Sequence, residues 1–120
     1  MYIIYDSDEI KKLQNKYLLL EMDTIKTPVD TFTAHCIIPT DSINVSEMNT
    51  LDLLENEHKT LIKHYKSQKW NLCISSIESL KGIFKGEMDS FYDILTTRIE
   101  KYKKTKKNDS WSYIIDKTIS

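Results

Sequence analysis

The spacing of apolar residues changes from strand-like to helix-like near residue 45, and this change constrains the fold more than any other feature. Before it, apolar residues occur in short runs at 2–5, 17–22 and 31–38, and the third run alternates with a period of two. Thr-Pro-Val-Asp at 27–30 separates the last two runs. The pattern predicts an antiparallel hairpin, because these residue types favour turns.

A short helix is predicted between the first two runs, with Ser7 as its N-cap and an end near Asn15. From Ser46 onward the apolar spacing is three and four, which is typical of helices. Ser46 is the expected N-cap of the first long helix. Ser67-Gln68-Lys69 breaks the pattern, a second helix begins at Trp70, and a third begins near Asp89-Ser90.

These elements predict an α+β fold in one domain. A small, mainly antiparallel N-terminal sheet with a short helix occupies the strand-rich part, residues 1–45. Three antiparallel helices follow in residues 46–107. Residues 108–120 form a tail, and its weak alternation leaves open whether it returns to the sheet as a strand.

No apolar run approaches the roughly 20 residues that a membrane-spanning helix needs, and the N-terminus lacks a basic region followed by an apolar stretch. We therefore expect a cytoplasmic protein without a membrane partner. Cys36 and Cys73 are the only cysteines, and they stand too far apart for a redox or zinc motif. They are expected to be small buried hydrophobic residues.

The sequence offers no catalytic, cofactor or metal site. Glu55 and His58 have the spacing of half a di-iron site, but neither His35 nor His64 completes a second half. With two glycines in the whole chain, there is no glycine-rich loop to hold a phosphate. Because acid–base pairs need no fixed spacing, a small enzyme with a carboxylate-based site stays open as the weakest alternative.

A run of lysines near the C-terminus is the main charge feature. Residues 98–120 carry seven basic and three acidic side chains, although the whole chain has a net charge of −1. The run could bind nucleic acid, with the following aromatic residues stacking on bases. Alternatively, it is a solvated helix end whose aromatic residues pack back on the domain. The candidate binding residues are Lys101, Lys103, Lys104, Lys106, Lys107, Trp111 and Tyr113.

Two resemblances concern the helical part. The segment 61–80, in which Tyr65 closes one helix and Trp70 opens the next, resembles one helix-turn-helix of the tetratricopeptide type. The window 65–99 is also similar to the helical tail that follows the catalytic domain of class III adenylate cyclases. No residues of that catalytic domain accompany it, so the likeness implies a helical hairpin but does not imply cyclase activity.

Over most of its length, the chain resembles small proteins of marine tailed phages that have no known activity. The resemblance lies in Lys-Trp-Asn at 69–71, Leu-Lys-Gly at 80–82 and Gly-Glu-Met-Asp-Ser-Phe-Tyr-Asp at 86–93. It implies a phage-encoded protein in the cytoplasm of the host cell.

Together, these observations favour a non-enzymatic module that binds a protein partner or its own copy. The alternative is a nucleic-acid accessory protein that acts through the lysine run and Trp111.

Overall fold

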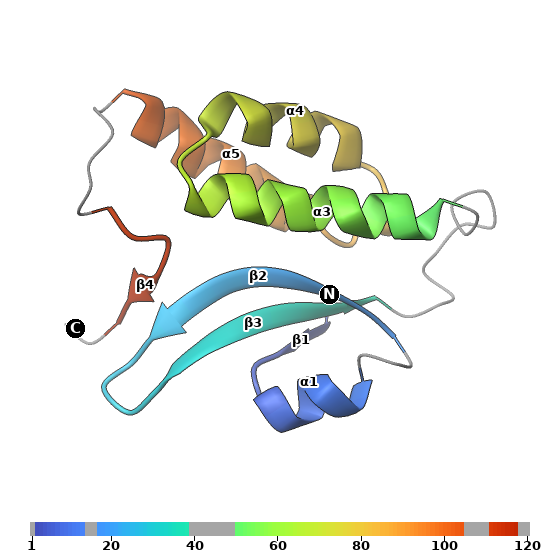
Figure 1. The fold of residues 1–120 in the computed structure, drawn as a ribbon, viewed down its shortest axis with the longest axis vertical. Helices are drawn as coiled ribbons and strands as arrows, with labels where there is room; N and C mark the ends of the chain where they lie inside the picture. Colours follow the sequence, from blue (N-terminus) through green and yellow to red (C-terminus); the bar gives the residue numbers. More distant parts are fainter. Residues whose placement is uncertain (1, 14–16, 39–49, 105–110, 118–120) are drawn as a thin grey trace.

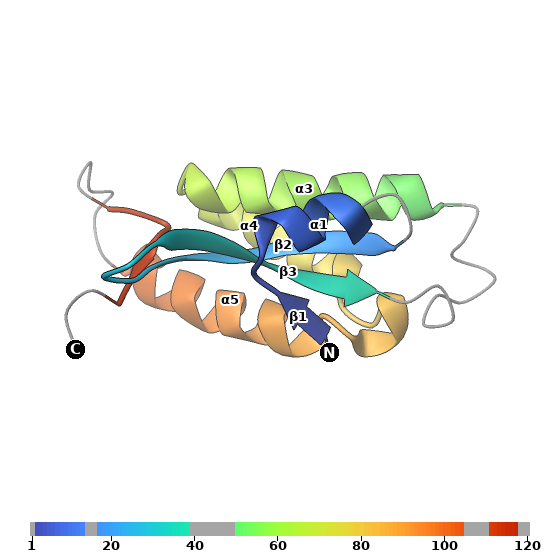
Figure 2. The ribbon, with the colours of Figure 1, turned by 90° about the horizontal axis from the view of Figure 1, so that it is seen from below.

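The structure is a computed structural model that describes residues 2–13, 17–38, 50–104 and 111–117. It has the predicted α+β architecture, with a four-stranded sheet and three long helices packed on one face of that sheet (Figure 1). The short N-terminal helix lies on the opposite face, as the view from below shows (Figure 2). The sheet therefore has one densely covered face and one lightly covered face.

The sheet contains β1 (Tyr2–Ile4), β2 (Leu18–Lys26), β3 (Thr31–Ile38) and β4 (Ile115–Asp116), in the order β1-β3-β2-β4. β3 pairs antiparallel with both β1 and β2, which confirms the predicted hairpin. The tail does return to the sheet, but only as the two residues of β4, which pair parallel to the end of β2. The sheet is thus mixed, with antiparallel pairing predominant.

β2 continues four residues past the predicted end of its apolar run, and a register shift interrupts its pairing with β3. Leu18 and Leu20 face the helices, opposite Ile38 and Cys36. The shift falls between Glu21 and Thr24. Such bulges bend a strand and re-aim its side chains.

The helices are α1 (Ser7–Leu13), α3 (Leu51–Lys66), α4 (Trp70–Leu80) and α5 (Asp89–Lys103). The prediction that Ser7 caps α1 is wrong. Asp6 is the cap, because its Oδ1 accepts the backbone N–H groups of Asp8 and Glu9 at 2.8 and 3.2 Å. Residues 14–16, where α1 was expected to end, and the expected cap Ser46 lie outside the described residues.

The breaks between the long helices use backbone conformations that the sequence signals. Gln68, between α3 and α4, has a φ of 60°. Gly82 after α4 has a φ of 84°, a region in which glycine is free of the Cβ clash. Its N–H donates to Oδ1 of Asp89 at 3.0 Å, which ties the loop to the start of α5.

The core lies between the sheet and the three long helices, and it combines residues of both. Cys36 and Cys73 are completely buried, as expected, and neither forms a disulfide; burial raises the pKa of the Cys73 thiol to about 11. Among the described helices, none has the length and apolar character needed to cross a lipid bilayer. The largest fully buried side chains include Tyr92, Phe84, Phe91, Leu20, Ile38, Leu61, Leu80, Met88, Leu95 and Ile99.

Two neighbouring residues of α5 test which face of this helix is packed. Leu95 is fully buried, whereas the side chain of Ile94 is 48% exposed. We expect Leu95→Ala to lower the free energy of unfolding by about 3 kcal/mol, because it leaves a cavity, and Ile94→Ala to lower it by less than about 1 kcal/mol. Urea denaturation of both variants measures the difference. Equal losses would contradict this orientation of α5.

Candidate functional site

The lysine run begins where the sequence places it, at the C-terminal end of α5. Lys101 and Lys103 belong to the last turn of the helix and Lys104 follows it, and all three are exposed. Lys106 and Lys107 lie outside the described residues. Cations at the C-terminal end of a helix interact favourably with the helix dipole, so these lysines also stabilise α5.

Trp111 belongs to an aromatic cluster together with Tyr65, Trp70 and Tyr102. The Trp111 ring centroid lies 5.7 Å from that of Tyr65, 5.4 Å from that of Trp70 and 5.6 Å from that of Tyr102, each in an edge-to-face arrangement. Such geometry is favourable for aromatic pairs. Burial raises the pKa of Tyr65 in the cluster to about 12. Of the two arrangements left open for Trp111, the structure has the packed one.

Tyr113 also packs back on the domain. Its ring lies 4.7 Å from Nζ of Lys66, in a cation–π contact. Neither of the two candidate aromatic residues is therefore a free platform for a nucleic-acid base.

The aromatic cluster brings the C-terminal ends of α3 and α5 to the same end of the molecule, at the left in Figure 1. Sequence reasoning missed the lysines that α3 and the α3–α4 turn contribute there. The pairing of the tail with β2 adds two more, because the N–H of Lys117 donates to the carbonyl of Lys26 at 2.7 Å. We call this set the lysine end: Lys26, Lys63, Lys66, Lys69, Lys101, Lys103, Lys104 and Lys117.

The single arginine of the chain is engaged inside the fold. Nη1 and Nη2 of Arg98 on α5 donate to the two carboxylate oxygens of Asp23 at 2.7 and 3.1 Å. Asp23 follows Glu21 in the irregular part of β2, so the bulge supplies this partner. The hydrogen bond to Asp23 raises the pKa of Arg98, although burial opposes the shift. A bidentate pair of this kind holds α5 against the sheet.

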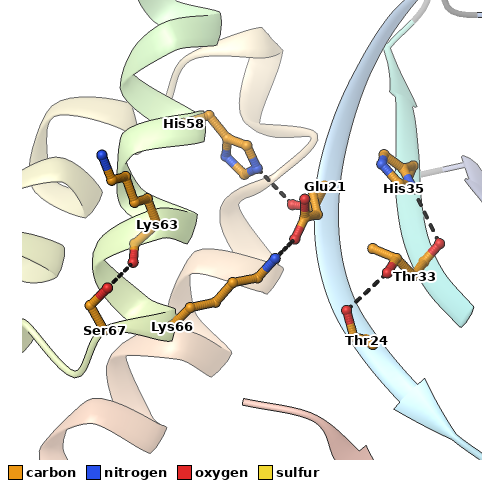
Figure 3. Close-up of polar contacts among 8 residues, drawn as sticks. All are labelled: Glu21, Thr24, Thr33, His35, His58, Lys63, Lys66 and Ser67. Atoms are coloured by element: carbon orange, nitrogen blue, oxygen red, sulfur yellow. Dashed lines mark hydrogen bonds and ion pairs between the residues drawn. The ribbon is translucent and has the colours of Figure 1, made fainter. Parts of the chain in front are cut away.

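His58 on α3 is almost completely buried, with 1% of its surface exposed. Its Nε2 lies 2.7 Å from the carbonyl oxygen of Glu21, and its Nδ1 lies 2.9 Å from the hydroxyl of Tyr92 (Figure 3 shows the first contact). Burial is the main cause that lowers the pKa of His58 from its ordinary value of 6.5. The imidazole is neutral at pH 7 as a result.

The partners of a neutral His58 determine its tautomer. A carbonyl oxygen only accepts, so Nε2 carries the proton and donates it to Glu21. Nδ1 then accepts the hydroxyl proton of Tyr92. Both ring nitrogens are therefore occupied, and neither is available to a substrate.

Glu21 joins this arrangement through its side chain as well. Its Oε2 lies 2.7 Å from Nζ of Lys66, as an ion pair that lacks the angles of a directed hydrogen bond (Figure 3). The backbone and side chain of one residue thus hold two positions of α3 on β2.

Among the described residues, no group of three potential metal ligands comes together, Glu55 and His58 included.

A groove of about 680 Å³ lies between α1, together with Tyr5 and Asp6 before it, on one side and β3 on the other. α1 buries none of its residues, which leaves this space on the lightly covered face of the sheet. Tyr5 and Phe32 form an apolar edge-to-face pair in the groove, with centroids 5.1 Å apart. Its charged lining residues are Asp6, Asp8, Lys11 and Asp30.

No protein-family model, curated protein or solved structure matches this chain.

The buried imidazole predicts a specific pH dependence of stability. His58 has a lower pKa folded than unfolded, so protons bind preferentially to the unfolded chain. The His58 contribution is constant above about pH 7 and is lost as the pH falls below 6.5 towards the folded-state pKa, with a limiting slope of about 1.4 kcal/mol per pH unit. Urea denaturation between pH 5 and 8 measures this slope.

His58→Gln should remove that component of the slope, whereas His64→Gln, a change of the same kind in the last turn of α3, should retain it. If His64→Gln removed the slope and His58→Gln did not, the assignment to the buried imidazole would be wrong.

Proposed function

We propose that this protein is a non-enzymatic interaction module that binds an extended segment of a protein partner in the groove between α1 and β3. The observation that carries the proposal is the groove itself, which lies beside an open edge of the sheet. A phage-encoded origin is part of the same proposal and rests on the resemblance to small proteins of marine tailed phages.

The open edge consists of β1, the outermost strand, and of residues 31–34 of β3, which extend past the paired part of β1 and include lining residues of the groove. Within the described part of the chain, β1 pairs with β3 and no strand pairs with its other side. Ile3 and Tyr5 are 40% and 49% exposed there. A peptide that adds as a further strand would gain backbone hydrogen bonds from this edge and side-chain contacts from the groove.

The groove favours a peptide with basic and apolar side chains. Asp8 and Asp30 are exposed at its rim, and Lys11 opposes only part of their charge. The carboxylate of Asp6 is already used to cap α1. Tyr5 and Phe32 offer the apolar contact that alternate residues of an extended peptide need.

The best-formed polar contacts elsewhere support a binding role over catalysis. His58 is buried with both nitrogens engaged, and Arg98 is paired with Asp23. These groups hold secondary-structure elements together and do not line the groove.

A fluorescent ten-residue peptide of alternating lysine and valine tests the proposal by fluorescence anisotropy. We expect it to bind more tightly than the matching peptide of glutamate and valine. Thr31→Trp, which places a large ring at an exposed lining position, should weaken binding at least tenfold. Leu72→Trp, at an exposed position of α4, is the control and should bind normally. If both peptides failed to bind, or if the two variants behaved alike, the groove would not be the site.

A second copy of the chain is the other candidate partner for the β1 edge, because an antiparallel pair of identical strands has two-fold symmetry. Sedimentation equilibrium over a range of concentrations tests it. Self-association through β1 should give a mass that rises with concentration and should be lost in Ile3→Lys, which places a charge on the open edge.

A further inference from the structure

We propose that the lysine end binds the phosphate backbone of double-stranded nucleic acid, at a site separate from the groove. The site is composite: α3 and the α3–α4 turn supply Lys63 and Lys69, and α5 supplies Lys101, Lys103 and Lys104. The proposal does not depend on the peptide-binding function, because the two sites share no residue.

The aromatic cluster fixes these lysines relative to one another. Tyr65 precedes Lys66 at the end of α3, Trp70 follows Lys69 and Tyr102 stands between Lys101 and Lys103. The ring centroids of Tyr65 and Trp70 are 5.8 Å apart, and those of Trp70 and Tyr102 are 5.4 Å apart. These contacts therefore hold the ends of α3 and α5, and the lysines that these ends carry, at one end of the molecule.

The net charge of this end is positive after its acidic residues are taken into account. Glu21 neutralises Lys66 through their ion pair. Glu100, Asp116 and Asp30, which lies in the turn that follows Lys26, are exposed near the same end. The remaining lysines outnumber them, and the exposed Lys63, Lys69, Lys103 and Lys104 have no ion-pair partner among the described residues.

The chemistry at this end selects phosphates over bases. Arg98, the only arginine, is bound to Asp23 through both terminal nitrogens, so its planar fork is not available to a guanine. Lysine offers a point charge on a flexible stem, which suits phosphate contacts and carries no sequence information.

The same packing disfavours single strands. Single-strand binding proteins combine a basic surface with exposed aromatic rings on which bases stack. Here Trp70, Tyr102 and Trp111 pack against one another, and Tyr113 contacts Lys66. A duplex, whose phosphates are exposed and whose bases are stacked internally, is the ligand that this arrangement fits.

Fluorescence anisotropy with a labelled 20-base-pair DNA duplex and the corresponding 20-nucleotide single strand tests the proposal. We expect the full chain to bind the duplex more tightly, with an affinity that falls about 100-fold between 50 and 200 mM salt if about four phosphates are contacted. Trp70 and Trp111 are the only two tryptophans, so their emission should stay unchanged on binding.

Two double variants test whether the site is composite. Lys63→Gln with Lys69→Gln, and Lys103→Gln with Lys104→Gln, should each weaken duplex binding about tenfold and make the salt slope shallower by about 1.8. Lys11→Gln with Lys12→Gln, on the exposed side of α1, is the matched control and should leave binding unchanged.

Several results would overturn the proposal. These are no duplex binding at 50 mM salt, tighter binding of the single strand with quenched tryptophan emission, or an equal loss in the α1 control. Loss in the α5 variant alone would reduce the site to the sequence run and would contradict the composite surface. Binding to vesicles of anionic phospholipid without binding to the duplex would assign the lysines to a membrane surface.

Discussion

A neutral imidazole buried between a strand edge and two helices holds this fold together. β2 pairs with β3 on one side, and along most of its length its other side has no strand partner in the described structure. An unpaired carbonyl on a buried edge costs free energy, and His58 removes that cost for Glu21 by donating to its oxygen. Because the other nitrogen accepts from Tyr92, the same ring also connects α3 with α5.

The irregularity in β2 is the second device that joins sheet and helices. A regular strand would alternate its side chains between faces, so Glu21 and Asp23 would both point away from the helices that Leu18 and Leu20 face. Around the bulge both carboxylates instead meet cations of the helical layer, Lys66 on α3 and Arg98 on α5. The half-buried Arg98 pair is the better formed of the two, because it is bidentate.

Local patterns predicted the elements that depend on local signals. Alternation at 31–38 and the turn at 27–30 were enough to predict the hairpin. Apolar spacing of three and four residues was enough to predict the long helices. The cap of α1 was wrong by one residue, because Asp6 and Ser7 are both good caps and only the geometry separates them. The partners of His58 and the mixed character of the sheet could not be predicted, since they join residues far apart in the chain.

In the candidate sites too, some features could be predicted from local sequence and others depend on contacts between distant residues. The run from Lys101 was visible in the sequence, but Lys63 and Lys69 enter the lysine end only through the three-dimensional meeting of Tyr65, Trp70, Tyr102 and Trp111. The groove depends on how loosely α1 lies on the sheet, which no residue spacing encodes.

The parallel pairing of β4 with β2 has a consequence for the order of assembly during synthesis. Ile25 finds its partner Ile115 only after the three long helices that lie between them in the chain have been translated. The hairpin of β2 and β3 and its helical cover can form earlier from nearby segments, since closing short loops is fast. The segment that follows α5 therefore completes both the sheet and the aromatic cluster after the helices have formed, so a chain truncated before Trp111 would expose the rings of Tyr65, Trp70 and Tyr102.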